Sequence, residues 1–403
     1  MMAHGNTPPT GVARVTETIL AACAITVMAL LLLRQAGAPL LYDEVFHYGR
    51  IEKILQGTVT VRDFGVMFPG YHLVVAALLK LTGLGSVAAA RVISLLLSLM
   101  SCVAAYGIAR TIDRSTALLR TLQFALFPIL LPFFPLLYTD PLSLAFLLFA
   151  LLAALRSRPF LLAIFFLLAV FVRQNNVLWA PFLFALLLPE APAWSVVLRR
   201  PKAMLRIAWP LLPPVIVFLL FVAWTGRASL NPDLALAHPF PAFLSGNIFF
   251  TLFLFTLLFL PLVAARARVT VRLLRRPSTW LLLVALFTVF SIFFAVDHPA
   301  NSEVGRLRDT ILLAADAGGL PGFFFWLAGA IAVLTMMATP LARRSFLWIY
   351  PLSLLYLGGS WLIDPRYAIV PLVLFLLLRK PSSWRMDILQ LGYNILLLLW
   401  VFW

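Results

Sequence analysis

Apolar segments recur along the whole chain, and this pattern constrains the fold more than any other feature of the sequence. A bilayer interior offers no water to unpaired backbone groups, so segments of this kind cross it as helices. Several segments are shorter than the roughly 20 residues that a span needs, so their ends take in flanking polar residues or lie in a thinned, protein-lined region. The thirteen segments are 19–33, 92–108, 117–137, 141–155, 160–172, 177–188, 207–224, 248–264, 280–296, 322–338, 346–363, 368–378 and 388–403.

The composition agrees with a polytopic membrane protein. Of the 403 residues, 63% are apolar and only 11% are charged, which leaves little room for a soluble domain. The formal net charge of +16 would suggest nucleic acid in a soluble protein, but here cytoplasmic loops explain it and no nucleic-acid partner is expected. Cys23 and Cys102 lie inside apolar segments, as small core residues do. The sequence predicts one all-α membrane domain over residues 1–403.

The first apolar segment has two interpretations. Residues 19–33 form a short apolar core, and Ala36-Gly37-Ala38 resembles the small-residue site of a signal peptide. Pro39 directly after this triplet argues against cleavage. We expect a first membrane helix here, with the signal peptide as the alternative.

The basic residues predict the orientation. If residues 70–84 lie at the outer interface as a juxtamembrane helix instead of crossing, 20 of the 31 basic residues face the cytoplasm and 11 of the 15 acids face outward. The pattern therefore predicts about thirteen spans, with the N-terminus inside. The inward basic residues are Arg14, Arg110, Arg114, Arg120, Arg156, Arg158, Arg199, Arg200, Lys202, Arg206, Arg266, Arg268, Arg272, Arg275, Arg276, Arg343, Arg344, Arg379, Lys380 and Arg385.

Nearly every unusual polar group then lies on the outer face. The groups are Asp43 and Glu44 in "LLYDEVFHYGR", "LYTD" at 137–140, "VRQNN" at 172–176, His238, "DHPANSEVGRLRD" at 297–309 and "DPRY" at 364–367. Pro128, Pro132 and Pro135 break up the third segment, as is tolerated where a helix lines a cavity.

This set of groups fits an enzyme that uses a lipid phosphate. Arg173, Arg306, Arg308 and Arg366 could converge on a phosphate, which a guanidinium fork suits. A carboxylate would take the proton of an acceptor hydroxyl, and the arginines would stabilise the departing phosphate. Each feature also has a simpler interpretation: loop charges, lipid-headgroup arginines and histidines beside proline turns. No metal-ligand spacing and no glycine-rich phosphate loop is visible.

Several motifs resemble the C-superfamily of integral-membrane glycosyltransferases. "FPGYHLVVAALLKLTGLGSVAAARVISLL" is similar to its juxtamembrane helix and second span, and "LYTD" to its outer-loop tyrosine-aspartate motif. Within it, the chain resembles the dolichyl-phosphate-glucose α-1,2-glucosyltransferases. Their D-E-x-F-H corresponds to Asp43–His47, their R-Q-T-N-x-x-W to Arg173–Trp179 with Asn175 in place of Thr, and their acidic-x-R-Y-x-I-x-P to Asp364–Pro371.

The chain also departs from the family pattern. His298-Pro299 and Arg306 match a further motif, but its acid comes one residue early, at Glu303. The Pro-Gln that usually follows F-H-x is replaced by Gly49-Arg50. The loop after the seventh segment keeps only His238. The acceptor therefore need not be the N-glycan precursor.

The resemblance implies a fold and a reaction. It implies a family module over about 15–225, followed by variable helices over about 226–403. A hexose, glucose by resemblance, would move from a polyprenyl or dolichyl phosphate to a lipid-linked or cell-surface glycan, with inversion to an α linkage, α-1,2 by resemblance. No cofactor is expected, although the superfamily includes metal-dependent members.

The expected roles follow the motifs. Asp43 is the expected general base, and Glu44 would orient it or contact the acceptor. Arg366, Arg306 and Arg173 would hold the donor phosphate, with a structural Asp364–Arg366 ion pair as the alternative for Arg366. The remaining expected substrate contacts are His47, Tyr138, Asp140, Gln174, Asn176, His298, Asp364 and Tyr367.

Other functions and locations stay open. A transporter or flippase of lipid-linked sugars would also need many spans and phosphate-binding arginines, but it should carry ionisable groups near mid-span and repeated halves. The placement of charged residues does not distinguish a ligase or polymerase of preassembled glycans from an enzyme that transfers a single sugar. The chain has no N-x-Ser/Thr sequon, since Pro8 follows Asn6-Thr7. With its short loops this favours a prokaryotic plasma membrane over the endoplasmic reticulum, with the active site on the outer or lumenal face.

Overall fold

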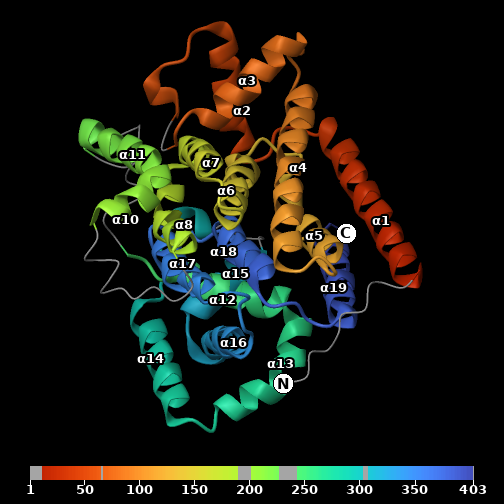
Figure 1. Ribbon diagram of the computed structural model, residues 1–403, viewed down its shortest axis with the longest axis vertical. Helices are drawn as coiled ribbons and strands as arrows, with labels where there is room; N and C mark the ends of the chain where they lie inside the picture. Colours follow the sequence, from red (N-terminus) through yellow and green to blue (C-terminus); the bar gives the residue numbers. More distant parts are fainter. Residues whose placement is uncertain (1–10, 65–66, 189–200, 227–242, 303–306, 403) are drawn as a thin grey trace. The chain divides into compact units, whose positions relative to one another are not determined.

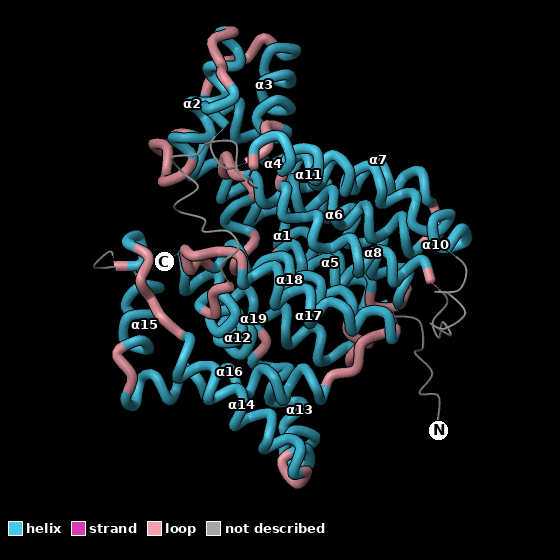
Figure 2. Tube along the Cα trace, turned by 90° about the vertical axis from the view of Figure 1, so that its left-hand side faces the viewer, coloured by secondary structure: helices cyan, strands magenta, loops and turns pink. Residues whose placement is uncertain are grey.

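The computed structural model describes residues 11–64, 67–188, 201–226, 243–302 and 307–402. Within these ranges the regular elements are α- and 3-10 helices, and no strand is formed beyond one isolated bridge between Leu341 and Arg379 (Figure 2). The all-helical fold class is therefore confirmed for the described part of the chain.

The chain divides into two compact units. Unit 1 takes Met1–Pro232 with Ile395–Trp403, and unit 2 takes Asp233–Asn394. The single domain over residues 1–403 and the family module over about 15–225, which the resemblance implies, stay predictions. The helices of unit 1 are α1 (Gly11–Ala36), α2 (Glu44–Gln56), η1 (Val61–Phe64), α3 (Gly70–Thr82), α4 (Val87–Ile112), α5 (Ala117–Ala125), η2 (Leu131–Phe133), α6 (Thr139–Leu155), α7 (Pro159–Val172), η3 (Gln174–Trp179), α8 (Ala180–Leu187), α10 (Pro201–Ala208), η4 (Trp209–Leu211) and α11 (Leu212–Thr225).

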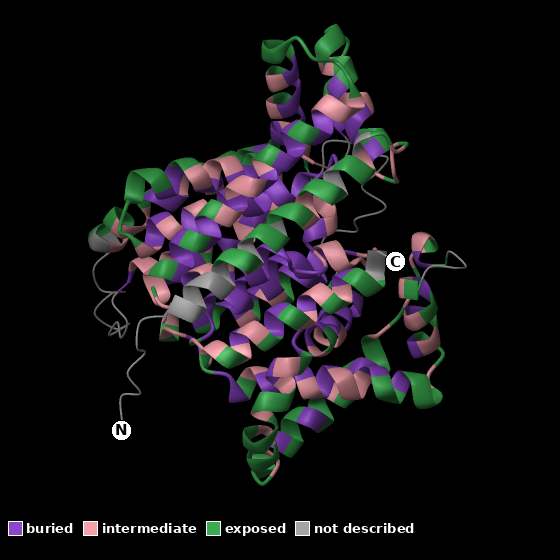
Figure 3. Cartoon of the chain, turned by 90° about the vertical axis from the view of Figure 1, so that its right-hand side faces the viewer, coloured by how far each residue is buried: buried purple, intermediate pink, exposed green. Residues whose placement is uncertain are grey.

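The core of unit 1 is a bundle in which α6 packs against both α4 and α7. Most side chains of α6 are buried, because an all-apolar helix without a polar face is stable only when neighbours surround it. Along other helices, exposed positions alternate with buried ones (Figure 3). The third apolar segment is broken as expected: α5 ends at Ala125 and the chain turns past Pro128, since proline lacks the N–H that continues a helix.

Helices α2 and α3 lie at one end of this bundle. They pack against each other, and α3 also contacts α4 and α7; in Figure 1 both lie above α6 and α7, beside the upper part of α4. A Cβ on Gly70 would come within 2.5 Å of the Phe171 carbonyl oxygen, so only glycine lets α3 begin this close to the end of α7. The opposite end of the bundle carries Arg110, in the last turn of α4, and Arg156, the C-cap residue of α6. The arrangement agrees with a non-spanning α3, which stays a prediction.

Unit 2 is built around α12, which packs on α16 and α18. Its helices are α12 (Gly246–Leu258), α13 (Leu260–Leu273), α14 (Pro277–Phe293), η6 (Pro299–Asn301), α15 (Leu307–Asp316), α16 (Gly319–Ala338), η7 (Arg344–Trp348), α17 (Ile349–Gly358), α18 (Pro365–Leu378) and the first part of α19 (Trp384–Phe402). One expectation is wrong here: segment 248–264 is not one continuous helix. The helix ends at Leu258 and turns by 95° into α13, whose first turn contains Pro261, and a proline begins a helix more readily than it continues one.

Within the ranges that the structure describes, three helices are each long and apolar enough to cross a bilayer, in agreement with an integral membrane protein. They are Val87–Ile112, Met204–Thr225 and Gly319–Ala338, and the bent α12–α13 pair would be a fourth. Other apolar segments form shorter helices; α8 has 8 residues and α17 has 10. The topology of about thirteen spans stays a prediction.

Candidate active site

The turn before α2 sets the geometry of the acidic motif. Tyr42 adopts φ 47°, a left-handed conformation that costs a non-glycine residue roughly 1–2 kcal/mol. Asp43 then occupies the N-cap position and Glu44 the first turn of α2, where carboxylates are favoured by the exposed N–H groups. A strained turn thus places two adjacent carboxylates in different surroundings.

Glu44 is completely buried and its carboxylate is fully engaged. Its Oε1 accepts hydrogen bonds from Arg91 Nε and the Leu137 backbone N–H, each at 3.0 Å. Its Oε2 accepts from Arg91 Nη2 at 2.6 Å and from the Leu41 N–H at 3.0 Å. With two donors on each oxygen, this geometry supports a positioning role for Glu44 over contact with an acceptor.

Arg91, at the start of α4, is the partner that the sequence analysis missed. Its remaining N–H groups donate to the carbonyl oxygens of Gln35, Ala38 at 2.7 Å and Pro39 at 3.1 Å, so all five guanidinium donors have an acceptor. Arg91 and Glu44 together join the end of α1, the start of α2, α4 and the chain before Tyr138. A lone arginine at the edge of an apolar segment was the signal, because such a residue needs a named partner.

Asp43 differs from its neighbour in exposure. Its side chain is only half-buried and makes no capping hydrogen bond to the backbone of α2. Its own carbonyl accepts the N–H of His47 at 3.0 Å, which fixes the first turn of the helix. Of the two adjacent carboxylates, Asp43 has the exposure that a general base requires.

His47 connects the acidic motif with the Tyr138 motif. Its Nδ1 lies 2.9 Å from His72 Nε2 of α3, and both histidines are buried. The ring of His47 meets that of Tyr138 edge-on, with centroids 5.7 Å apart. Residues separated widely in the sequence therefore gather at one end of the α4–α6–α7 bundle.

The Arg173 motif lies at this same end. Arg173, directly after α7, forms an ion pair with Asp140 in the first turn of α6. Asn176 is fully buried and donates to Ser143 Oγ at 2.7 Å and to the Ala169 carbonyl at 2.8 Å. The side-chain oxygen of Gln174 accepts the N–H of Phe68 at 3.4 Å. Unit 1 thus brings together all eight of the residues expected from its three motifs: Asp43, Glu44, His47, Tyr138, Asp140, Arg173, Gln174 and Asn176.

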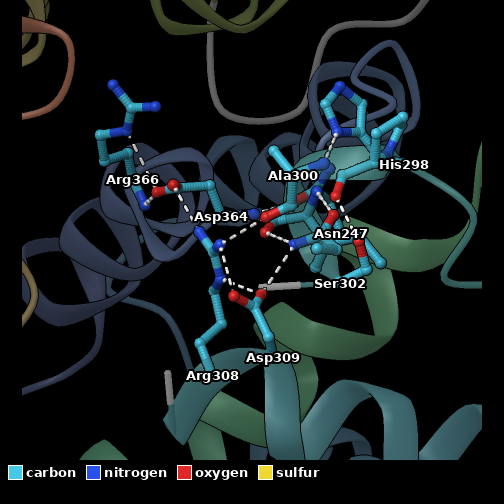
Figure 4. A network of polar contacts seen from close by, with 11 residues as sticks. Asn247, His298, Ala300, Ser302, Arg308, Asp309, Asp364 and Arg366 are labelled. Atoms are coloured by element: carbon cyan, nitrogen blue, oxygen red, sulfur yellow. Dashed lines mark hydrogen bonds and ion pairs between the residues drawn. The ribbon is translucent and has the colours of Figure 1, made fainter. Parts of the chain in front are cut away.

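Unit 2 contains a second polar network, centred on Asp364 (Figure 4). Asp364 caps α18 by accepting the backbone N–H of Arg366 at 2.9 Å, and the same oxygen accepts Arg366 Nε at 3.1 Å. Its other oxygen accepts Arg308 Nη1 at 3.0 Å. Burial raises the pKa of Asp364, but the Arg366 charge, the Arg366 N–H and the Arg308 charge together hold it below the usual range. In Figure 4 the end of the Arg366 side chain points away from the other labelled residues.

Two buried asparagines hold the chain before Asp364. Asn247 donates to the carbonyls of Ser360 and Leu362 and accepts the N–H of Asp364 at 3.1 Å. Asn301 accepts the N–H of Ile363 at 3.0 Å and donates to the Ile363 carbonyl and to Asp309. Neither asparagine was expected; only their place next to outer-face motifs could have indicated them.

The other expected residues of unit 2 have local roles. His298 accepts the Ala300 N–H on Nδ1 at 3.0 Å and packs edge-on against Trp361. Arg308 donates to Asp309, Asp364 and the Ala300 carbonyl. Tyr367 is buried in the first turn of α18. Arg306, like Glu303 and His238, lies outside the described residues.

Metal ligands do not gather in the described ranges, where no three His, Cys, Asp or Glu side chains form a group that could hold an ion. The expectation that no metal takes part stays a prediction.

Comparison with known proteins agrees with the motifs of unit 1. Residues 38–193 match the sequence model of the DIE2/ALG10 family, which confirms the resemblance to the dolichyl-phosphate-glucose α-1,2-glucosyltransferases over that segment. All eight motif residues of unit 1 lie inside it, and the network of unit 2 lies outside.

Two solved structures are similar to the chain at low identity. The crystal structure of ArnT from Cupriavidus metallidurans in the apo state is 15% identical, with a TM-score of 0.45 over 95% of this chain and 78% of that one. The structure of the same protein bound to undecaprenyl phosphate is 14% identical, with a TM-score of 0.39 over 96% and 78%. No curated protein sequence matches the chain.

Proposed function

We propose that the protein is an inverting glycosyltransferase that transfers a hexose, glucose by family resemblance, from a polyprenyl phosphate to a glycan acceptor. The observation that carries the proposal is the convergence of three motifs from the matched segment 38–193. The ion pair of Asp140 with Arg173 and the ring contact of His47 with Tyr138 bring them to one end of one bundle.

In the proposed reaction, Asp43 accepts the proton of the acceptor hydroxyl while its oxygen attacks C1 of the hexose. The bond between C1 and the phosphate oxygen breaks on the opposite side, and polyprenyl phosphate leaves with the electron pair. One displacement converts a β-linked donor into an α-linked product, so one base is enough. Arg366 is proposed to stabilise the negative charge of the leaving phosphate.

The neighbours of Asp43 support its assignment as the base. Glu44 is saturated by four hydrogen bonds, whereas Asp43 is half-buried. A base must reach the hydroxyl proton within about 2.6–3.2 Å, which the enclosed Glu44 carboxylate could do only if the contact with Arg91 broke. The face of the membrane is proposed to be the outer or lumenal one, because Arg110 and Arg156 lie at the ends of α4 and α6 that are far from the site.

The proposal is tested with purified protein, radiolabelled polyprenyl-phosphate glucose and a panel of lipid-linked glycans. We expect an acceptor that is one hexose longer, with α configuration, and release of polyprenyl phosphate. A protein that moved the labelled donor across a vesicle membrane without extending any acceptor would be a transporter instead, and the proposal would be wrong.

A further inference from the structure

Arg50 is a charged residue of the candidate site that no motif accounts for. It lies on α2, about one turn after His47, and its side chain is half-buried. It also marks a departure from the family motif, which has Gln at this position. A half-buried guanidinium beside the expected base needs a physical explanation.

The surroundings use only part of the Arg50 guanidinium. Its Nε donates to the backbone carbonyl of Asp63 at 2.5 Å. No hydrogen bond or ion pair of its two terminal nitrogens is formed with the described residues. A guanidinium offers five N–H donors, and the Nε contact uses one of those of Arg50, so its terminal nitrogens stay available to a ligand.

The nearest carboxylate on η1 does not neutralise Arg50. Asp63 is already bound by Lys53 Nζ at 2.5 Å and by the N–H and Oγ1 of Thr60, each at 2.7 Å. Hydrogen bonds from Lys53 and Thr60 lower the pKa of Asp63, so it stays ionised for these partners. Arg50 therefore receives from this segment a carbonyl contact only.

Asp43 is the other acid near Arg50. Burial lowers the pKa of the Arg50 guanidinium, while the charges of Asp43 and Asp63 act in the opposite direction. Asp43 and Arg50 nevertheless form no ion pair within 4.0 Å. A proton-accepting carboxylate and a guanidinium thus lie near each other, and the terminal nitrogens of the guanidinium keep hydrogen-bonding capacity for a ligand.

We propose that Arg50 binds an oxyanion of the substrate, a phosphate or a carboxylate, held next to Asp43. The two uncommitted nitrogens form the fork that pairs with two oxygens of such a group. Because Asp43 would take the proton of the acceptor, the oxyanion belongs to an acidic glycan acceptor; the phosphate of the donor is the other source of the same chemistry. The inference rests on the proposed function, and it narrows the acceptor to an acidic class.

The test compares the parent protein with Arg50→Gln, which keeps the length and polarity of the side chain and restores the family residue. Arg62→Gln is the matched control, since Arg62 is an exposed arginine on the neighbouring η1. Two lipid-linked glycans are used that differ only in ending with glucuronic acid or with glucose. The proteins are placed in phosphatidylcholine nanodiscs, which exclude anionic headgroups as the ligand.

We expect the parent to prefer the acidic acceptor. Arg50→Gln should lower kcat/KM for that acceptor by about 10- to 100-fold, the range of a lost charge-assisted hydrogen bond, and change the neutral one by less than about 3-fold. Arg50→Lys keeps the charge without the fork and should recover part of the lost kcat/KM. This recovery keeps the test valid if Arg50→Gln fails to fold. A rise in the donor KM that is equal with both acceptors would support the same site with the donor phosphate as its ligand.

Equal kinetics of Arg50→Gln and the parent on both acceptors and on the donor would overturn the inference, as would an equal loss in Arg62→Gln. Equilibrium binding of the labelled acidic acceptor separates this failure from failure of the proposed function. If the parent transfers nothing but binds that acceptor about 10-fold or more tightly than Arg50→Gln does, the oxyanion site stands and the proposed reaction is wrong.

Discussion

Two acid–arginine pairs, one in each unit, use the same groups in different ways. Glu44 and Arg91 are both completely enclosed, and every donor and acceptor of the pair is used. Asp364 and Arg366 remain 12% and 14% exposed, and the end of the Arg366 side chain points away from its partner in Figure 4. The Glu44–Arg91 pair links four segments of backbone by hydrogen bonds. The Asp364–Arg366 pair stabilises the N-terminus of α18 and leaves part of the arginine exposed.

This difference shows that an ion pair near a motif does not identify a catalytic group. An enclosed pair with saturated oxygens supports the positions of its neighbours, and these are the residues to test for chemistry. A partly exposed pair at the first turn of a helix can exchange a protein partner for a ligand. Glu44 and Arg91 are therefore expected to affect stability first, and Arg366 to affect substrate binding first.

The largest stability effect is expected when one partner of the enclosed pair is removed. Glu44→Gln or Arg91→Met should lower the free energy of unfolding by roughly 3–5 kcal/mol, because the remaining charge is buried without its partner. Chemical denaturation in detergent measures this. Asp364→Asn, tested in parallel, should lower the free energy of unfolding clearly less. An equal loss would show that the two pairs do not differ in this way.

Arg366→Lys tests whether the partly exposed Asp364–Arg366 pair binds substrate. Lysine keeps the charge but loses the two-pronged geometry, so affinity for polyprenyl-phosphate glucose and the transfer rate should both fall by about 10-fold or more while the melting temperature holds. Donor binding and thermal unfolding are the measurements. If donor affinity is unchanged and Arg366→Ala melts together with Asp364→Asn, the pair is structural.

The smallest expected effect is a pH dependence of stability from Asp364. Its pKa in the folded protein lies below that of the unfolded chain, because Arg366 and Arg308 favour the charged form against burial. Its contribution is therefore complete above the unfolded pKa of about 3.9 and is lost as the pH falls through the folded value. The stability gap between the parent and Asp364→Asn should be widest near neutral pH and should narrow below about pH 4. A gap that stays constant down to pH 3 would show that Asp364 acts through shape alone.

The sequence predicts the all-helical fold class but only some of the points where a helix ends within an apolar segment. The apolar segments indicate helices throughout, and the prolines at 128, 132 and 135 explain why 117–137 does not continue as one helix. The 95° turn between α12 and α13 was missed because hydropathy runs straight through it. Pro261 carried the signal, since proline in a first turn marks a new helix.

The candidate site was predictable as a set of motifs but not as a geometry. Asp43 and Glu44 are adjacent in the sequence. Only the fold shows that Arg91, 47 residues after Glu44, donates hydrogen bonds to the carboxylate of Glu44. Asp140 and Arg173, 33 residues apart, were expected near one site without any indication that they pair. Such long-range partners depend on packing, which local patterns do not specify.

Asp43, beside the saturated Glu44, is proposed to be the base that starts sugar transfer. The most direct test is single-turnover transfer from labelled polyprenyl-phosphate glucose by the parent and by Asp43→Asn, with donor binding measured on the same samples. We expect normal expression and donor affinity for Asp43→Asn, with a transfer rate lower by a factor of about 10² to 10⁴. Transfer at the parent rate by Asp43→Asn would contradict this proposal, and would reduce the acidic motif to a loop beside a structural ion pair.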